Sequence, residues 1–371
     1  MAGDAVYNKI SETFGYSGSK NLLKYLKVLF TPEEGEFLLE MVAPVTLKQL
    51  AARLKTDEKS LAEKLEGLRR RRLLFKKGDQ YLFHLARHGF FARIAAARDE
   101  DIPEGFWKAW DDFMPEVEQE MITRSIKVAK KSPPTGIMTR IIPAWLAIQS
   151  NPRLKPEDIL PEEDIHAQLR MKGAQEVIAV FDCPCRRRAR RCDRPTFNCM
   201  EFGKYAEFNL NQSTVLKTIS VDEAIAISDE AEKAGLLKSG GLRKENGGVL
   251  CHCCECCCNV MGATIRTGTA HELRSPSRFR ARVDEAGCAG CQECVDRCFF
   301  EAIEMKKVPG SKKLKAFVNT EKCMGCGLCV INCKQKALIF DLVKPPEYLL
   351  SQPASSSKEE APIWQSFSSA P

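Results

Sequence analysis

Cysteine is the residue type that most constrains this chain. There are 18 cysteines among 371 residues, and 14 of them fall in two dense clusters, at 251–258 and 288–333. The N-terminal stretch MAGDAVYNKISETF has no charged start followed by an apolar core, so we expect no export signal and a cytoplasmic protein. No apolar run approaches the roughly 18 residues that a membrane span needs. Because cytoplasmic thiols stay reduced, the cysteines are expected to bind metal rather than to form disulfides.

The second cluster contains an internal repeat. The spacing C-x2-C-x2-C-x3-C occurs twice, with each cysteine of the second copy 35 residues after its counterpart in the first. The two copies are Cys288, Cys291, Cys294 and Cys298, and Cys323, Cys326, Cys329 and Cys333. Such short spacing lets three thiolates of one loop bind three irons of a cubane cluster. Zinc sites usually pair two C-x2-C units across a long gap, so the repeat favours two 4Fe–4S clusters.

The repeat resembles two-cluster ferredoxin domains of the bacterial type, over roughly residues 278–343. The resemblance implies that the fourth cysteine of each copy begins a helix and binds the other cluster. The implied ligand sets are Cys288, Cys291, Cys294 and Cys333 for cluster 1, and Cys323, Cys326, Cys329 and Cys298 for cluster 2. Strands are expected to begin at Ala302 and Ala337. The family usually has proline after the fourth cysteine, where this chain has Phe299 and Lys334.

Ten further cysteines precede this repeat. They form two groups separated by 51 residues: Cys183, Cys185, Cys192 and Cys199, and then Cys251, Cys253, Cys254, Cys256, Cys257 and Cys258. Neighbouring side chains on one backbone point in different directions, so six adjacent thiols cannot all converge on one four-site cluster. Either eight of the ten hold two more cubanes, or all ten share one unusual cluster with spare thiols. We expect at least one further iron–sulfur cluster, with structural zinc and redox-active thiols as alternatives. His252 is a ligand or a spectator.

The combination of a C-P-C-R segment and a C-x-C-C-x-C-C-C segment ahead of the repeat resembles iron–sulfur proteins of anaerobic bacteria and archaea. Cluster binding and electron transfer are what that resemblance implies. Arginines interleave the first cysteine group, together with Asp193: Arg186, Arg187, Arg188, Arg190, Arg191 and Arg194. They are a solvated basic loop, a counter-charge that raises a cluster's potential, or a docking patch for an acidic redox partner. A nucleic-acid patch is less expected, because no aromatic residue interleaves them before Phe197.

The N-terminal pattern predicts a compact, mostly helical domain. Capping boxes begin helices at Thr31 and Thr46, and three leucines at helical spacing mark a third helix: Leu61, Leu65 and Leu68. A glycine-containing turn at 77–80 between two apolar segments predicts a hairpin. This order of helix, helix–turn–helix and hairpin resembles the winged-helix domains of bacterial regulators.

The middle of the chain gives weaker signals. Residues 96–165 predict helices joined by an extended connector, with an aromatic packing patch of Trp107, Trp110, Phe113 and Met114. The apolar run 177–181 predicts a buried strand, and Ser220 begins a helix that ends near Lys233. The expected fold is therefore α+β and multidomain. Its parts are a winged-helix-like domain (1–95), a helical connector (96–165), a Cys-rich domain expected to bind iron–sulfur (166–274), a two-cluster 4Fe–4S ferredoxin-like domain (275–345) and a disordered tail (346–371).

Electron transfer is the function that this pattern favours. The sequence contains no P-loop, no G-x-G-x-x-G between a strand and a helix, and no C-x-x-C-H haem signature, so no enzyme activity is assigned. The rivals are a redox-responsive DNA-binding regulator and the iron–sulfur subunit of a reductase. Acidic residues such as Glu63 and Glu66 on the third N-terminal helix, beside Lys59 and Lys64, would oppose phosphate contacts, so docking of redox partner proteins is favoured over DNA.

The net charge says little about partners. The formal value of +7 counts every cysteine as neutral. Two cubanes bound by thiolates would bring it to about +3, and four to about −1.

Overall fold

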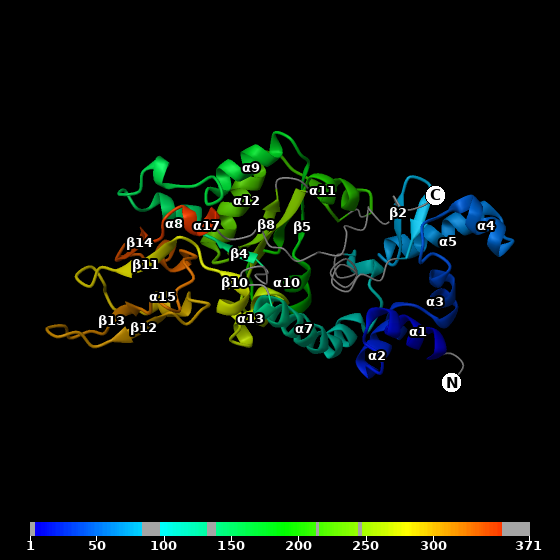
Figure 1. Ribbon diagram of the computed structural model, residues 1–371, viewed down its shortest axis with the longest axis horizontal. Helices are drawn as coiled ribbons and strands as arrows, with labels where there is room; N and C mark the ends of the chain where they lie inside the picture. Colours follow the sequence, from blue (N-terminus) through cyan, green and yellow to red (C-terminus); the bar gives the residue numbers. More distant parts are fainter. Residues whose placement is uncertain (1–3, 84–96, 132–138, 213–214, 244–246, 351–371) are drawn as a thin grey trace. The chain divides into compact units, whose positions relative to one another are not determined.

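A computed structural model describes residues 4–350, apart from 84–96, 132–138, 213–214 and 244–246. The described residues form two compact units (Figure 1). Unit 1 contains those within Met1–Gln119 and Glu207–Lys217, and unit 2 contains those within Glu120–Ala206 and Thr218–Ser357. Among the described residues, no helix has both the length and the apolar character needed to cross a membrane.

Unit 1 begins with the helices and the hairpin that the sequence predicts. Its elements are α1 (Ala5–Phe14), α2 (Lys20–Leu29), α3 (Pro32–Leu39), β1 (Val45–Thr46), α4 (Leu47–Leu54), α5 (Glu58–Arg70), β2 (Phe75–Lys77), β3 (Gln80–Leu82) and the 3-10 turn η2 (Asp99–Asp101). Both capping boxes are confirmed, with Thr31 paired to Glu34 and Thr46 to Gln49. The three strands form a sheet in the order β1-β3-β2. Membership of the winged-helix family stays a prediction.

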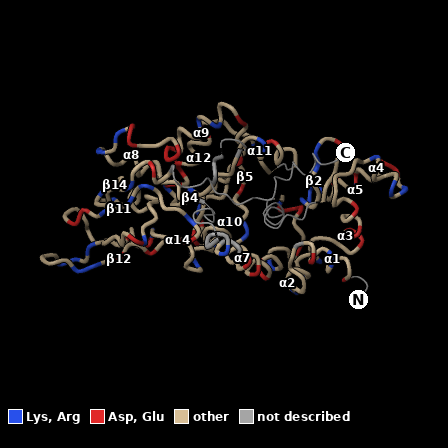
Figure 2. The backbone as a smooth tube through the Cα atoms, in the orientation of Figure 1, with Lys and Arg blue, Asp and Glu red and all other residues tan. Residues whose placement is uncertain are grey.

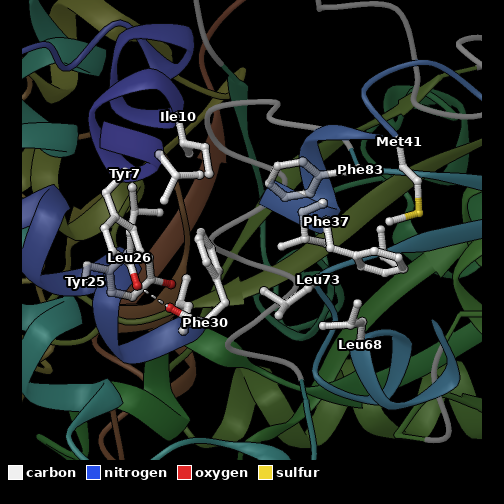
Figure 3. Packing of buried hydrophobic residues seen from close by; sticks show 14 of the residues in the cluster. Tyr7, Ile10, Tyr25, Leu26, Phe30, Phe37, Met41, Leu68, Leu73 and Phe83 are labelled. Carbon is white, nitrogen blue, oxygen red and sulfur yellow. Dashed lines mark hydrogen bonds between the residues drawn. The ribbon is translucent and has the colours of Figure 1, made fainter. Parts of the chain in front are cut away.

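The core of unit 1 combines aromatic and aliphatic side chains (Figure 3). The Tyr7 hydroxyl donates to the carbonyl of Phe30 at 2.8 Å, which joins α1 to the end of α2. Tyr25 packs against Trp110 and Phe113 from α7 (Phe106–Lys131), with ring centroids 5.8 and 6.0 Å apart. The expected patch therefore lies in a core: Trp110, Phe113 and Met114 are buried, and Trp107 is partly buried.

One segment of unit 1 comes from the expected Cys-rich domain. Gln212 donates to the carbonyl of Lys76 at 2.6 Å and accepts from its amide at 2.8 Å, as an added strand would. Phe208 stacks on Phe75 with ring centroids 6.0 Å apart. The segment 207–212 thus packs with the N-terminal hairpin rather than with the domain that we expected at 166–274.

A seven-stranded sheet dominates unit 2. Its order is β10-β4-β8-β9-β6-β5-β7, antiparallel where pairings are resolved except for the parallel pair β10–β4. The strands are β4 (Thr139–Ile142), β5 (Ile178–Asp182), β6 (Phe197–Phe202), β7 (Lys217–Thr218), β8 (Leu237–Arg243), β9 (Gly247–Cys253) and β10 (Arg274–Ser275). The predicted strand at 177–181 is β5. Within 96–165, where we expected helices joined by an extended connector, the segment Thr139–Ile142 forms β4, with Ile141 fully buried.

The helices α9 (Ile165–Gly173) and α12 (Val221–Lys233) cover one face of this sheet. The other helices near the sheet are α8 (Trp145–Gln149), α10 (Pro184–Ala189), α11 (Gly203–Leu210), α13 (Met261–Arg266) and α14 (Ala270–Leu273), with a 3-10 turn η3 (Pro156–Asp158). The predicted helix at Ser220 is α12, with its capping box intact. α9 and α12 bury an apolar layer against the sheet that includes Leu169, Val180 and Leu250. Since side chains alternate along a strand, residues beside Leu250 on β9 face the other side.

The C-terminal part of unit 2 contains two small antiparallel ladders. β11 (Phe279–Val283) pairs with β14 (Leu338–Leu342), and β12 (Ile303–Lys306) pairs with β13 (Lys315–Val318). Strands were expected from Ala302 and Ala337, and they begin one residue later. The tail that we expected to be disordered begins with a short helix, α17 (Glu347–Leu350), in which Leu349 is buried. Residues 351–371 lie outside the described part of the chain.

The expectation that each fourth cysteine begins a helix is wrong. The short helices α15 (Glu293–Asp296) and α16 (Leu328–Ile331) contain the third cysteine of each copy, and the fourth follows them. Three residues after the fourth cysteines, Glu301 and Lys336 adopt positive φ values of 49° and 52°. Left-handed backbone at these positions ends any helix that the fourth cysteine could have started.

Candidate metal centres

Each ligand set that the repeat implies lines one cavity. Side chains around the first cavity include Cys288, Cys291, Cys294 and Cys333. Side chains around the second include Cys298, Cys323, Cys326 and Cys329. The fourth cysteine of each copy therefore lies with the first three of the other copy. Ligation by these eight thiols stays a prediction, but the structure brings the two sets together as expected.

The backbone around both cavities fits an inorganic cluster. Gly290 and Gly325 have φ values of 72° and 68°, and a Cβ there would lie 2.4 Å from the carbonyl oxygen of Leu314 and 2.2 Å from that of Phe279. Only glycine allows the chain to pass this closely. The amide of Ala302 lies 3.3 Å from the sulfur of Cys298, a donor placed to stabilise a thiolate.

Burial makes Cys294 and Cys326 poor acids without a metal. It raises the pKa of Cys326 to about 12 and that of Cys294 to about 11. A buried thiolate needs a cation or hydrogen-bond donors beside it. Bound iron supplies the cation, so the donor chemistry of both cavities suits soft, thiolate-bound metal.

A comparison with protein families agrees with this geometry. Residues 287–338 match the family model described as a 4Fe-4S dicluster domain. This segment is a 4Fe–4S dicluster domain. The family implies two 4Fe–4S clusters and electron transfer in general. No curated protein and no solved structure matches the chain.

The ten cysteines upstream of the dicluster domain divide into six and four. Six thiols form a closed ring in which each one lies close enough to the next to shift its pKa. In ring order they are Cys183, Cys185, Cys258, Cys253, Cys251 and Cys199; we call them the six-thiol ring. The other four gather separately, with all sulfurs within 4.8 Å of one another. They are Cys192, Cys254, Cys256 and Cys257, the four-thiol group. Which of the two expected arrangements holds, two further cubanes on eight of the ten thiols or one cluster shared by all ten, stays a prediction.

Strand pairing builds the six-thiol ring. Cys251 and Cys253 are two residues apart on β9, so both lie on the face opposite Leu250 and the helices. β6 pairs with β9 through Met200 and Leu250, which places Cys199 opposite Cys251. Cys183 and Cys185 come from the start of α10, and Cys258 precedes α13. The Sγ atoms of Cys258 and Cys253 lie 3.6 Å apart.

Neighbouring thiols of the six-thiol ring shift one another's pKa. Hydrogen bonds from neighbouring thiols lower the pKa of every second sulfur, namely Cys183, Cys251 and Cys258. The same hydrogen bonds raise the pKa of the thiols between them, Cys185, Cys199 and Cys253. The backbone amide of Met261 donates to the sulfur of Cys258 at 3.1 Å. The ring thus concentrates negative charge where a soft cation would be favoured.

Two buried arginines flank the six-thiol ring. Arg186 is 2% exposed, and it donates to the carbonyls of His252 at 2.8 Å and Pro195 at 2.6 Å. Burial works against its charge, but nearby thiolates led by that of Cys183 raise its pKa overall. Arg274 is 1% exposed and donates to Thr264 Oγ1 at 3.2 Å. Sequence reasoning did not single out Arg274, because an isolated arginine 16 residues past the last of these cysteines gives no signal.

The remaining arginines of the loop differ in role. Arg194 forms a 2.7 Å ion pair with Glu255 and lies over the ring of Phe299, 5.3 Å from its centroid. Arg191 donates to the carbonyl of Cys256 at 3.2 Å. The loop is therefore structural as well as basic. The contact with Arg194 also gives a reason for Phe299, which replaces the family's usual proline.

His252 lies away from both thiol groups. It is fully buried, with Nδ1 2.6 Å from the carbonyl oxygen of Asn198 and Nε2 3.4 Å from the hydroxyl of Ser228. Burial lowers the pKa of His252 to about 3, so its imidazole is neutral. As the residue between Cys251 and Cys253, it points to the helix-covered face of the sheet. This geometry favours the alternative in which His252 does not bind a metal.

Proposed function

We propose that this protein relays single electrons through the dicluster domain and one further centre held by the six-thiol ring. A 4Fe–4S cluster, when bound, supplies reversible one-electron oxidation and reduction. The observation that carries the proposal is a shared core. Cys253 and Cys258 of the ring pack in the same apolar cluster as Cys294 and Cys329 of the dicluster domain.

Backbone contacts support a fixed connection between these two regions. The amide of Ala144, at the start of α8, donates to the carbonyl of Cys326 at 2.9 Å. Ser277, just after β10, donates through its hydroxyl to the carbonyl of Gly325 at 2.6 Å. The sheet that carries the ring is therefore tied to the loop that carries part of the second ligand set. A rigid, apolar path is what short-range electron transfer between centres requires, since reorganisation is small in a dry interior.

The buried charges support a redox centre rather than a bare thiol pocket. Six close thiols carry more negative charge than an apolar interior tolerates, and Arg186 offsets part of it. A guanidinium beside thiolates stabilises the more negative, reduced state of a bound centre. Its role here is to position charge and to hold the carbonyl of His252 in place.

A lysine-rich hairpin offers a docking surface beside cluster 1. Lys307, Lys312 and Lys313 are exposed in the connection between β12 and β13, where Figure 2 shows a group of basic residues. Lys315 at the base of this hairpin donates to the carbonyl of Cys288. Cys291, in the same cavity, is exposed. We infer that an acidic redox partner docks here, because complementary charge speeds encounter.

The N-terminal helices support protein docking over DNA binding. On α5, Glu58, Glu63 and Glu66 are exposed alongside Lys59 and Lys64. Carboxylates on the face that would enter a groove repel phosphates. A winged-helix-like domain with this surface is proposed to bind protein, and nanomolar binding to one duplex sequence at physiological salt would contradict that.

The test of the electron-transfer proposal is an iron and sulfide count on anaerobically purified full-length protein. Two cubanes account for about 8 iron, and a further cubane in the six-thiol ring brings the count to about 12. Replacing Cys183 and Cys185 by Ser should lower it to about 8 while the dicluster signals in electron paramagnetic resonance persist, because serine oxygen is a poor ligand for soft iron. An unchanged iron count in this double variant would contradict a centre in the ring.

A further inference from the structure

The spacing of the four-thiol group differs from that of a cubane ligand set. Cys192 Sγ lies 3.8 Å from that of Cys257 and 4.0 Å from that of Cys254, and Cys256 Sγ lies 3.6 Å from that of Cys257. Four sulfurs bound to one tetrahedral ion at 2.3 Å lie about 3.8 Å from one another. In a cubane each thiolate binds a different iron, so the cluster keeps the sulfurs farther apart.

The dicluster domain provides an internal comparison. All eight of its cysteines are described, yet among the described residues only the four-thiol group has three or more potential metal-binding residues with their ligand atoms all within 4.8 Å. The cysteines that line the two cavities are therefore more widely spaced than these four. The sulfurs of the four-thiol group are therefore closer together than those of the two cavities in the dicluster domain.

The four-thiol group joins two loops that are distant in sequence. Cys192 follows α10, and the other three lie in the turn after β9. The Arg194–Glu255 ion pair, at 2.7 Å, connects the same two loops. A metal ion bound by these four thiols would cross-link the two loops.

The four-thiol group also belongs to a different core from the six-thiol ring. Cys254 and Cys257 pack with Ala231 and Leu236 in a small apolar cluster of their own. That cluster does not include the dicluster cysteines, which share a core with Cys253 and Cys258. A centre at the four-thiol group is therefore off the proposed electron path, and a redox-inert ion suits it.

We propose that Cys192, Cys254, Cys256 and Cys257 bind one structural Zn²⁺ ion. Tetrahedral coordination by four thiolates is the usual structural zinc site, and Zn²⁺ undergoes no redox change. The ion fixes the turn after β9 and so helps to position Cys253 and Cys258 of the ring. This assignment does not depend on electron transfer, because a zinc pin would serve a regulator or an enzyme subunit equally well.

Metal analysis of the full chain, expressed with both metals available, tests the assignment. We expect about one zinc per chain in addition to the iron. In the Cys256→Ser variant the zinc content per chain should fall at least tenfold, while the iron and sulfide contents stay unchanged. The matched control is Cys185→Ser in the six-thiol ring, which should lose iron and keep zinc.

Three outcomes would overturn the zinc assignment. The wild-type chain could contain no zinc, Cys256→Ser could lose about four iron with sulfide, as a cubane would, or it could lose one iron without sulfide, as a single tetrahedral iron would. A failure of the proposed electron-transfer centre would instead appear as unchanged iron in the variant of Cys183 and Cys185, whatever the zinc content.

X-ray absorption at the zinc edge gives a readout that needs no variant. The wild-type protein should show about four sulfur neighbours at about 2.3 Å and no nitrogen or oxygen in the first shell. Mixed sulfur and oxygen or nitrogen neighbours would indicate zinc bound adventitiously at other thiols and would contradict the site. This measurement decides the proposal even if Cys256→Ser does not fold.

Discussion

The dicluster domain and the seven-stranded sheet both gather thiols, but by different routes. In the dicluster domain the sulfurs come from two copies of one short loop. Each cavity is lined by the first three cysteines of one copy and the fourth cysteine of the other. In the sheet they come from segments 51 residues apart, which meet because β6 pairs with β9. A loop motif carries its geometry with it, whereas a site built across strands depends on their register.

Shifting the register of β9 should break one region and spare the other. Inserting one alanine between Leu250 and Cys251 turns each following strand residue to the opposite face. We expect the iron of the full chain to fall from about 12 to about 8 and the zinc to be lost, because both thiol groups depend on this strand. Iron, sulfide and zinc analysis measures the effect.

The control for this insertion is one alanine after Gly310, in the connection between β12 and β13, where a Cβ would meet no atom within 4 Å. That variant should keep all its metal. If the β9 insertion kept its zinc and its third centre, a local bulge would have absorbed the change, and register would not be what assembles the thiols.

The second prediction concerns Glu232, which binds the start of α8 next to the contact between Ala144 and Cys326. Glu232 on α12 is fully buried, and it accepts from the amides of Trp145 and Leu146 at 2.8 and 2.9 Å and pairs with buried Lys238. Glu232→Ala leaves that lysine without its carboxylate and α8 without its cap. We expect a loss of about 3–5 kcal/mol in the free energy of unfolding. Anaerobic denaturant unfolding measures it.

Glu230→Ala, two residues away on α12, is the matched control. Glu230 pairs with Lys233 at 2.7 Å, but both side chains are mostly exposed. No measurable change is expected, because solvent screens such pairs. Equal effects of the two substitutions would show that the buried carboxylate does not secure the start of α8, and with it the contact to Cys326.

The smallest expected effect concerns the docking surface of the dicluster domain. Charge reversal at Lys312 and Lys313 should slow oxidation of the reduced protein by ferricyanide, an anionic probe, several-fold at low ionic strength. The difference should shrink at high salt, where screening is strong. Stopped-flow absorbance measures the rate. Reversal at Lys48 and Lys59, which are exposed in unit 1, should leave it unchanged, and an equal slowing there would point to net charge alone.

Sequence spacing predicts the dicluster domain well because its ligands are local. The crossing of Cys298 and Cys333 between cavities is what the resemblance to two-cluster ferredoxins implies, and it needs no knowledge of the rest of the fold. The capping boxes at Thr31, Thr46 and Ser220 are equally local, and all three form. The helix expected at each fourth cysteine fails for a local reason that spacing does not show, namely the left-handed backbone at Glu301 and Lys336.

The division of the ten upstream cysteines could not be predicted in this way. Which sulfurs meet depends on the pairing of Met200 with Leu250 and on the turn that follows β9. One signal was present: C-H-C at the end of an apolar strand places two thiols on one face and the histidine on the other. It separates His252 from its neighbours, but it does not tell which partners they find across the sheet.

Cys253 and Cys254 are consecutive residues, yet one belongs to the six-thiol ring and the other to the four-thiol group. If both sites fill as proposed, a single peptide bond separates a ligand of the iron–sulfur centre from a ligand of the zinc ion. A metal bound at either site would fix the orientation of the Cys253–Cys254 peptide. That orientation would also affect the sulfur positions at the other site. Because Cys253 and Cys254 share that peptide, we expect metal binding at one site to restrict the sulfur positions at the other.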